Sequence, residues 1–345
     1  MSALASRRAQ PQRPAKPGPG RRSSPMSWRW GDRLALAFAW IAGIGLCVIA
    51  AAIVLYMGYR GIEYLRPKLL FSRPAVGTSQ SDTGGFLDPL LGTALLTVIG
   101  IALAVPLAVS SAVWISEYGR PTWVARVVES SIEIVAGTPD IVIALFGLAI
   151  FQLHLFAPFS FTASGGGVFG RSFIAAGAMM SLIALPPLFT ATRDGLQSVP
   201  AHMREAAFAL GKTRIATIRR VLLPSVRSNI ATGVTLGVSR IIGDTAIVVL
   251  LLGESLRLES QGSAPVVGML RGTGSTLTSY VYYNSPAGEG NSHEKAYAAA
   301  FVLLMIVLLL NALVTRLSTR SEAGGEPGIL RRSFANLFSK APWTR

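Results

Sequence analysis

Two oppositely charged residues stand four positions apart inside a long apolar segment. The segment runs from about Ser228 to Leu252 and contains Arg240 and Asp244. A guanidinium can bind phosphate or a similar oxyanion through two parallel N–H donors. Residues four apart also share one face of a continuous helix, so the spacing equally allows an ion pair that only fixes helix packing. Both interpretations stay open, and the first would place an anion path beside Arg240.

A second pair of charged residues, Glu133 and Asp140, lies near the start of another apolar segment, from about Ile132 to Leu155. The two carboxylates are seven residues apart, which places them on one side of a continuous helix. We interpret them as packing residues that cap a helix or pair with cations of a neighbouring subunit.

Three patterns that could indicate an enzyme lack the context that the chemistry needs. Leu210–Thr213 is similar to the end of a phosphate-binding P-loop, but Ala206 stands where the first glycine is required. The other two patterns are a glycine triplet and three histidines: Gly165, Gly167 and Gly170, and His154, His202 and His293. The glycines lack a strand–turn–helix context, and the histidines are far apart in the sequence. The sequence therefore predicts no catalytic site, no metal site and no ATP bound by this chain.

The composition excludes a water-soluble enzyme. Of the 345 residues, 51% are hydrophobic and only 14% are charged, and the mean hydropathy is +0.48. Soluble proteins carry about 25% charged residues. A soluble core could not cover this much apolar surface, so we expect one membrane-embedded unit. The single cysteine, Cys47, excludes a disulfide framework.

Six segments are apolar and long enough to cross a bilayer, which takes about 20 helical residues. Two are the charged segments above, and four contain no charge: Leu34–Met57, Pro89–Ile115, Ser172–Thr192 and Ala296–Thr315. The first has 24 uncharged residues, and because a signal peptide has only about 7–15, we expect it to remain as a span. The sequence predicts an all-α integral membrane protein with six transmembrane helices. Kinks are expected at four prolines: Pro106, Pro139, Pro186 and Pro187.

The basic residues predict the orientation. Of 32 lysines and arginines, 23 fall in segments that are cytoplasmic if the N-terminus is inside, and 8 fall in the opposite segments. We therefore expect both termini in the cytoplasm. We expect residues 1–33 to form a disordered basic tail that contacts anionic lipid, residues 34–320 the six-span domain, and residues 321–345 a C-terminal tail. This bias accounts for the net charge of +15 without a nucleic-acid partner.

The longest predicted cytoplasmic loop, Arg193–Arg227, contains helix signals of its own. Pro200 precedes a helix-favouring run that stops at Gly211, and a second run, Ile215–Leu223, ends before Pro224. We expect two short helices bent at Gly211. Small residues on the first helix would let another surface approach closely: Ala206, Ala207 and Ala209. Such a hairpin suits the docking of a cytoplasmic partner.

The same loop resembles the coupling loop of ABC-importer permeases. The matching positions are Glu205, Ala206, Ala207, Gly211, Leu223 and Pro224. Val221 stands where isoleucine is usual in that family. The pattern also precedes the fifth of six predicted spans, which is its place in the family. The resemblance implies a coupling helix that sits in a cleft of a separate ATPase subunit, and the alternative is an ordinary helix between two spans.

Further segments, between about Gly84 and Arg316, resemble the permeases of phosphate-specific importers. They are Leu91–Thr97, Ala104–Leu107, Ser116–Tyr118, Ala136–Val142, Leu145–Leu148 and Ser239–Ala246. Ala296–Ala300 is more similar to the A-type than to the C-type subunit of that family. Two positions depart from the pattern, because Asp140 replaces a common serine and Asp244 replaces a usual glutamate.

The resemblance implies a fold, partners and a mechanism. The fold is that of type I ABC-importer (MetI-like) permeases, with its core at about residues 89–316. The implied partners are a sister permease in a heterodimer, two ATP-binding subunits and an extracytoplasmic phosphate-binding protein at a bacterial inner membrane. ATP would be used by the partner subunit, and this chain would bind no cofactor. Alternating access would carry inorganic phosphate past Arg240, Asp244 and Thr245.

Three other functions fit parts of the pattern. A permease for another oxyanion or solute fits because Arg240 does not distinguish phosphate from sulfate. An ion-coupled secondary transporter would have internal repeats and discontinuous helices, and the sequence predicts neither. A membrane scaffold or sensor would leave the charges inside the spans without a purpose.

Overall fold

The computed structural model describes residues 30–62, 71–73, 85–119, 121–160, 170–253, 265–286 and 293–322. Every regular element within these ranges is helical, as predicted. The chain forms two compact units, residues 1–53 and 54–345, and their boundary lies within the first helix. Residues 1–29 of the predicted basic tail, the C-terminal tail from residue 323, and Gly165 and Gly167 lie outside the described residues.

Four long helices coincide with the four charge-free segments. They are α1 (Trp30–Gly61), α3 (Leu87–Val113), α6 (Phe173–Ser198) and α14 (His293–Glu322). Each is long and apolar enough to cross a bilayer. α3 passes through Pro106 and continues into the π-helix η3 (Trp114–Tyr118), and α6 passes through Pro186 and Pro187. None of these three prolines interrupts its helix.

The two charged segments form broken helices. α4 (Thr122–Gly137) and α5 (Asp140–Phe151) are bent by 109° at their junction, and α10 (Arg227–Gly243) and α11 (Ala246–Leu252) by 61°. The described part of the chain therefore has four candidate spans, or six if each bent pair counts as one. The prediction that the chain contains no discontinuous helices is wrong.

Backbone chemistry explains where these helices break. Pro139 has no N–H and disfavours a helical conformation in the residue before it, so Thr138 is extended with φ −81° and ψ 131°. The kink predicted at Pro139 is therefore a full break. At the second break, Asp244 is extended with ψ 135° directly after Gly243, and glycine has a low helix propensity.

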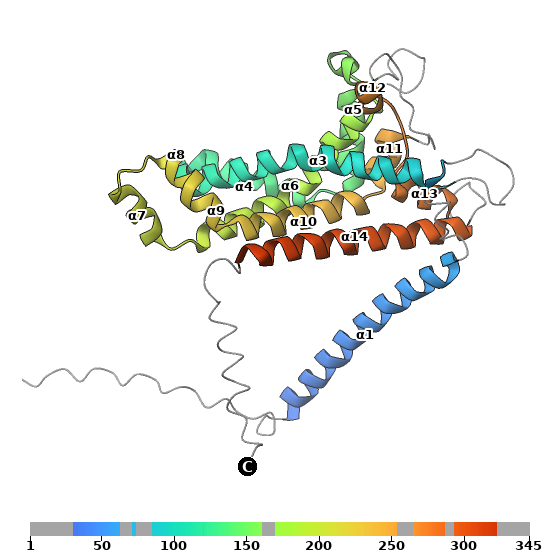
Figure 1. Ribbon diagram of the computed structural model, residues 1–345, viewed down its shortest axis with the longest axis horizontal. Helices are drawn as coiled ribbons and strands as arrows, with labels where there is room; N and C mark the ends of the chain where they lie inside the picture. The colour runs from blue at the N-terminus through green and yellow to red at the C-terminus, as the bar shows by residue number, and fades with distance from the viewer. Residues whose placement is uncertain are drawn as a thin grey trace, which may run out of the picture. The chain divides into compact units, whose positions relative to one another are not determined.

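The long helices of the second unit run side by side, and short elements gather at their ends (Figure 1). α3 packs on α6, α6 packs on α10, and α10 packs on α14. Near one end lie α7 (Ala201–Ala209), α8 (Arg214–Thr217), the π-helix η6 (Ile218–Leu222) and α9 (Leu223–Ser225). Toward the other end lie α11, α12 (Pro265–Arg271) and α13 (Leu277–Asn284). The remaining described element is the 3-10 helix η4 (His154–Phe159).

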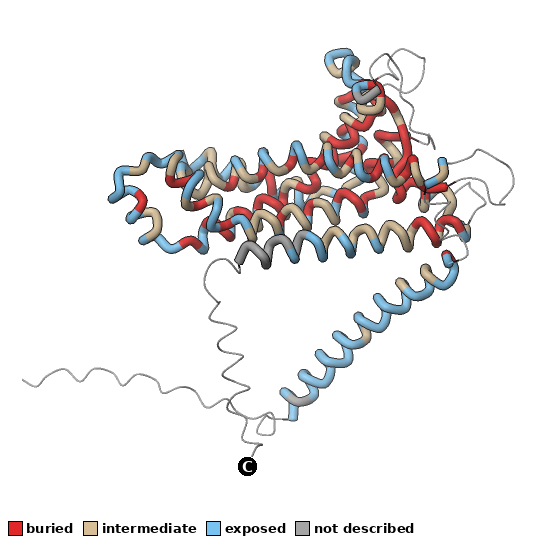
Figure 2. The backbone as a smooth tube through the Cα atoms, viewed as in Figure 1, coloured by how far each residue is buried: buried red, intermediate tan, exposed pale blue. Residues whose placement is uncertain are grey.

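Small residues at the helix contacts let the backbones approach closely. Ala104, Ala108 and Ala112 recur every fourth residue along α3 and are fully buried. A Cβ atom on Gly177 of α6 would lie 2.4 Å from the side chain of Ile99 of α3, so only glycine fits there. Close packing of this kind holds membrane helices together, because lipid gives apolar side chains little reason to associate. Figure 2 shows the buried residues concentrated along these contacts.

Candidate functional site

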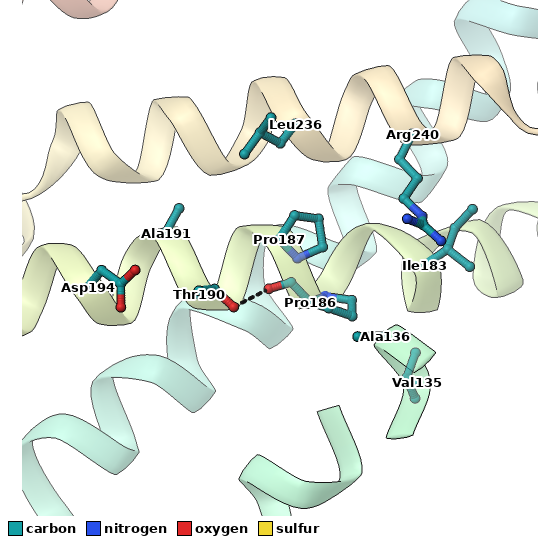
Figure 3. A pocket seen from close by; sticks show the side chains of 10 residues that line it. All are labelled: Val135, Ala136, Ile183, Pro186, Pro187, Thr190, Ala191, Asp194, Leu236 and Arg240. Atoms are coloured by element: carbon teal, nitrogen blue, oxygen red, sulfur yellow. Dashed lines mark hydrogen bonds between the residues drawn. The ribbon is translucent and has the colours of Figure 1, made fainter. Parts of the chain in front are cut away.

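A cavity of about 600 Å³ lies between α4, α6 and α10. Its wall is mostly apolar, and its polar side chains are Thr190, Asp194 and Arg240. Figure 3 shows the side chain of Arg240 extending from α10 toward Ile183 of α6, whereas Asp194 lies farther along α6, at the other side of the view. A largely apolar cavity with a few polar groups is the usual form of a small-molecule site.

Two consecutive prolines of α6 lie in the cavity wall and change the hydrogen bonds of that helix. Pro186 and Pro187 have no N–H, so the carbonyl oxygens of Leu182 and Ile183 lose their usual donor four residues on. Both prolines line the cavity, and Thr190 donates its hydroxyl proton to the Pro186 carbonyl at 2.9 Å. Two helix hydrogen bonds are therefore missing from the part of α6 that lines the cavity.

Arg240 pairs with Asp140 and not with Asp244. The Nη2 atom of Arg240 lies 3.0 Å from Oδ1 of Asp140. Asp140 is the first residue of α5, so the ion pair connects α10 with the break between α4 and α5. The interpretation of Arg240 and Asp244 as a pair on one helical face is wrong, because α10 ends at Gly243 and Asp244 is extended.

Asp244 lies two residues before helix α11, whose N-cap residue is Thr245. Oδ2 of Asp244 accepts a hydrogen bond from the backbone N–H of Ile247 at 2.8 Å, and Asp244 is only 8% exposed. This contact satisfies a backbone N–H in the first turn of α11, which has no acceptor within the helix. Thr245 is half-buried beside it. Of the three residues expected on the substrate path, Arg240 lines the cavity, whereas Asp244 and Thr245 do not.

Glu133 does not act together with Asp140. It is exposed on α4, and the break at Thr138 and Pro139 turns α5 away, so the prediction that the two carboxylates share one helical side is wrong. Another carboxylate of α4, Glu129, forms an ion pair with α6, and its Oε1 lies 2.7 Å from Nη2 of Arg193.

The hairpin predicted within residues 193–227 is present, and its turn forms at Gly211. Gly211 has φ 71°, a left-handed conformation that favours glycine. The N–H groups of Gly211 and Lys212 donate to the carbonyls of Phe208 and Ala207 at 2.9 and 3.1 Å. These bonds satisfy the last carbonyls of α7, so the turn is a capped helix end.

Apolar side chains gather around this turn. Three large ones are exposed by 45%, 80% and 60%: Phe208, Leu210 and Ile215. Of the matched positions on α7, Glu205 and Ala206 are exposed, whereas Ala207 is buried. Exposed apolar side chains rimmed by polar ones are typical of a surface that another protein covers.

The second half of the hairpin does not end before Pro224. α8, η6 and α9 follow one another without a gap, and Leu223 donates its N–H to the carbonyl of Ile218, five residues back. This wider π turn places Pro224 in the first turn of α9, where its missing N–H is not needed. Leu223 packs against the hydrophobic core. Leu223 and Pro224, the last two positions of the coupling-loop pattern, therefore belong to the junction with the membrane helices.

Arg204 fastens α7 to the membrane helices. Its Nε donates to Glu117 at 3.0 Å, its Nη1 to the Val199 carbonyl at 2.9 Å, and its Nη2 to the Leu196 carbonyl at 2.8 Å. The two carbonyls belong to the C-terminal end of α6, and Glu117 lies in η3 at the end of α3. One guanidinium therefore connects the hairpin to both α3 and α6.

The contact between Glu117 and Arg204 is a functional candidate that sequence reasoning missed. The two residues are 87 positions apart, and neither helix periodicity nor charge pattern in one sequence indicates such a pair. Arg214 adds to the same junction, with its guanidinium carbon 5.2 Å from the ring centre of Tyr118.

Known proteins similar to this chain are membrane components of transporters. Residues 104–323 match the family model described as binding-protein-dependent transport system inner membrane component. The chain is 28% identical to the probable ABC transporter permease protein YqgH of Bacillus subtilis, over 82% of this chain and 90% of the relative. It is 30% identical to the phosphate transport system permease protein PstA 1 of Mycobacterium tuberculosis, over 69% and 72%. It is 26% identical to the phosphate transport system permease protein PstC of Xylella fastidiosa, over 80% and 84%.

A solved structure has a similar fold. It is a chain in the crystal structure of a bacterial alginate ABC transporter in complex with an alginate pentasaccharide-bound periplasmic protein. The TM-score is 0.59 at 15% identity, and the match covers 84% of this chain and 95% of the other. The similarity in fold therefore extends over most of both chains.

Proposed function

Because this chain belongs to the family of binding-protein-dependent transport system inner membrane components, we propose that it is a permease subunit that imports inorganic phosphate with the energy of ATP. It is a transport component rather than an enzyme, and the predicted ABC-importer permease fold is confirmed. The observation that carries the phosphate assignment is the similarity to permeases of phosphate transport systems, and the cavity beside Arg240 supports it as a site for an oxyanion. The N–H donors of Arg240 match the oxygens of phosphate.

The hairpin is the proposed contact with the energy source. We assign the exposed surface around Glu205, Ala206 and Leu210 to docking on a separate ATP-binding subunit. Arg204 joins that surface to α3 and α6, and α6 forms one wall of the cavity. A displacement of the hairpin therefore moves the wall beside Arg240. ATP is used by the partner, and this chain needs no cofactor of its own.

The two helix breaks supply hinges next to the cavity. Asp140 follows one break and Asp244 lies in the other, and Arg240 lines the cavity near the end of α10, just before the second break. Hinges of this kind absorb changes in φ and ψ while the packed helices stay intact. Alternating access by rotation of helix groups around Arg240 is the mechanism that this arrangement supports.

The remaining partners and the orientation complete the proposal. A sister permease forms the other half of a heterodimer, two ATP-binding subunits dock at the cytoplasmic side, and an external phosphate-binding protein delivers the substrate. Both termini and the hairpin are cytoplasmic, because 23 of the 32 basic residues then lie inside. The relatives include A-type and C-type permeases, and the A-type assignment rests on Ala296–Ala300.

Uptake of radiolabelled phosphate tests this function. Cells that lack the chain and cells with the chain restored are compared at low phosphate, with excess unlabelled phosphate or sulfate as competitor. We expect uptake to return with the chain and to yield to phosphate but not to sulfate. Equal competition by sulfate would favour a general oxyanion permease. Uptake that persists without the ATP-binding subunit would favour an ion-coupled transporter.

A further inference from the structure

Arg240, whose guanidinium lines the cavity, already forms an ion pair with Asp140 of the same chain. Nη2 of Arg240 and Oδ1 of Asp140 are 3.0 Å apart, within the range of a charge-assisted hydrogen bond. The side chains remain 46% and 33% exposed, so the ion pair is not sealed. An anion in the cavity can therefore reach Arg240 without first unpacking the helices.

Arg240 and Asp140 belong to different helices, so their contact can break and another anion can take the place of Asp140. Asp140 is fixed at the start of α5, and Arg240 is fixed near the end of α10. The contact uses one Nη of a group that has five N–H donors. A small displacement of α10 relative to α5 would separate the pair while both helices stay intact. A partly exposed ion pair leaves room for a competing anion to approach the guanidinium and displace the carboxylate.

From these contacts we propose that Asp140 is a positioning residue that occupies Arg240 between transport events and competes with phosphate for it. The proposal rests on the proposed function, since it concerns how phosphate reaches and leaves Arg240. Phosphate displaces the Asp140 carboxylate when it enters the cavity. The carboxylate recovers the guanidinium as phosphate leaves.

The competition addresses two requirements of an anion path. An unpaired cation within the membrane is costly when no substrate is present, and Asp140 offsets that cost. A cation without a competitor would hold a phosphate ion tightly, whereas conduction needs binding that is weak enough to allow release. A purely structural ion pair would meet the first requirement and leave the release of phosphate unaffected.

The test uses the assembled transporter with its sister permease, ATP-binding subunits and binding protein in proteoliposomes, with radiolabelled inorganic phosphate as the probe. Asp140→Asn removes the charge and keeps the shape of the side chain, and Asp140→Ser is the second variant. We expect both complexes to assemble and to retain about two- to fivefold more phosphate after rapid gel filtration, because a weak ion pair no longer competes. Phosphate uptake falls by a similar factor, and Asp140→Glu stays close to the wild type.

Glu133→Gln is the matched control, because it removes the same charge from an exposed residue of α4 that does not line the cavity. Wild-type phosphate retention in both Asp140 variants would overturn the proposal, as would an equal rise in Glu133→Gln. Failure of both Asp140 variants to assemble would show a packing role and overturn it too. Normal uptake by Arg240→Gln would instead contradict the phosphate path itself, so the two failures are distinguishable.

Discussion

At the scale of residues, the proposed contact of Arg240 with an anion depends on the shape of its side chain. A guanidinium presents a planar fork of donors, whereas a lysine presents a point charge. We expect Arg240→Gln to lower the initial rate of labelled phosphate uptake by about ten- to a hundredfold, since a hydrogen bond to a charged group contributes about 1.5–3 kcal/mol. Arg240→Lys should keep part of the rate. Co-purification with the ATP-binding subunit shows assembly, and a wild-type rate in Arg240→Gln would remove Arg240 from the path.

Asp244 contributes a hydrogen bond to the chain itself. We expect Asp244→Ala to destabilise the permease by about 1 kcal/mol, because the N–H of Ile247 loses its acceptor. Asp244→Asn keeps an oxygen acceptor and should unfold close to the wild-type temperature. Thermal unfolding of the purified complex and phosphate uptake are measured together. Loss of uptake in Asp244→Asn at wild-type stability would instead show that the charge acts on the substrate.

Side-chain contacts were the least predictable part of the site. The sequence identifies Arg240 and Asp244 as unusual, because charges are costly within apolar segments. The spacing argument then fails, since it assumes one continuous helix and the chain breaks after Gly243. The actual partner of Arg240, Asp140, is 100 positions away. Distances of that kind depend on the tertiary packing and leave no local pattern.

At the scale of elements, the turn of the hairpin depends on one backbone conformation. Gly211 has φ 71°, and a Cβ atom there would meet nothing within 4 Å. Its substitution therefore costs conformational strain of about 1–2 kcal/mol, without a steric clash. We expect Gly211→Val to lower phosphate uptake per ATP hydrolysed, and Gly211→Asn to do so less, because asparagine tolerates this conformation. Equal coupling in Gly211→Val and the wild type would show that the hairpin does not transmit motion.

The connection between the hairpin and the membrane helices depends on Arg204. Its three donors hold Glu117 and two carbonyls of the α6 end at once, which a lysine cannot reproduce. We expect Arg204→Lys to leave ATP hydrolysis in place but to reduce the phosphate transported per ATP severalfold. Arg214→Lys is the control, because its contact with the Glu117 carbonyl is long, at 3.4 Å. An equal loss in both variants would mean that the three contacts of Arg204 contribute no more to coupling than the single long contact of Arg214.

Local signals explain which elements could be predicted. The four charge-free spans and the turn at Gly211 depend on residues adjacent in the sequence, and the structure confirms them. The continuation of the helix past Pro224 was not predictable, because it depends on the π turn of η6, for which the sequence gives no signal. Pro139 marked a kink, but the size of the bend follows from how α5 packs on α6 and α11.

At the scale of the whole permease, the helices that carry the hairpin also line the cavity. α6 meets Arg204 at its C-terminal end and presents the two prolines and Thr190 to the cavity farther along. A helix that is continuous between these points transmits a displacement as a rigid body. Under the proposed function, docking at the hairpin and access to Arg240 would be mechanically linked through α6.

This linkage requires the hairpin and the far end of the bundle to face opposite sides of the membrane. Thiol labelling in a Cys47→Ser background tests that arrangement, since Cys47 is the single cysteine of the chain. Leu210→Cys reports the hairpin, where the native side chain is 80% exposed, and Tyr282→Cys reports α13, where it is 46% exposed. We expect a membrane-impermeant reagent added to intact cells to label Tyr282→Cys, and to reach Leu210→Cys only after permeabilisation.

The same two cysteine variants also test, separately from the orientation, whether the hairpin docks on the ATP-binding subunit. If α7 sits in a cleft of the ATP-binding subunit, labelling of Leu210→Cys in permeabilised membranes should fall when that subunit is co-expressed, because the thiol becomes covered. Labelling of Tyr282→Cys should not change, which controls for expression and reagent access. Labelling of Leu210→Cys from outside intact cells would contradict the orientation. Unchanged labelling in the presence of the partner would leave the orientation intact and place the docking surface elsewhere on the cytoplasmic side.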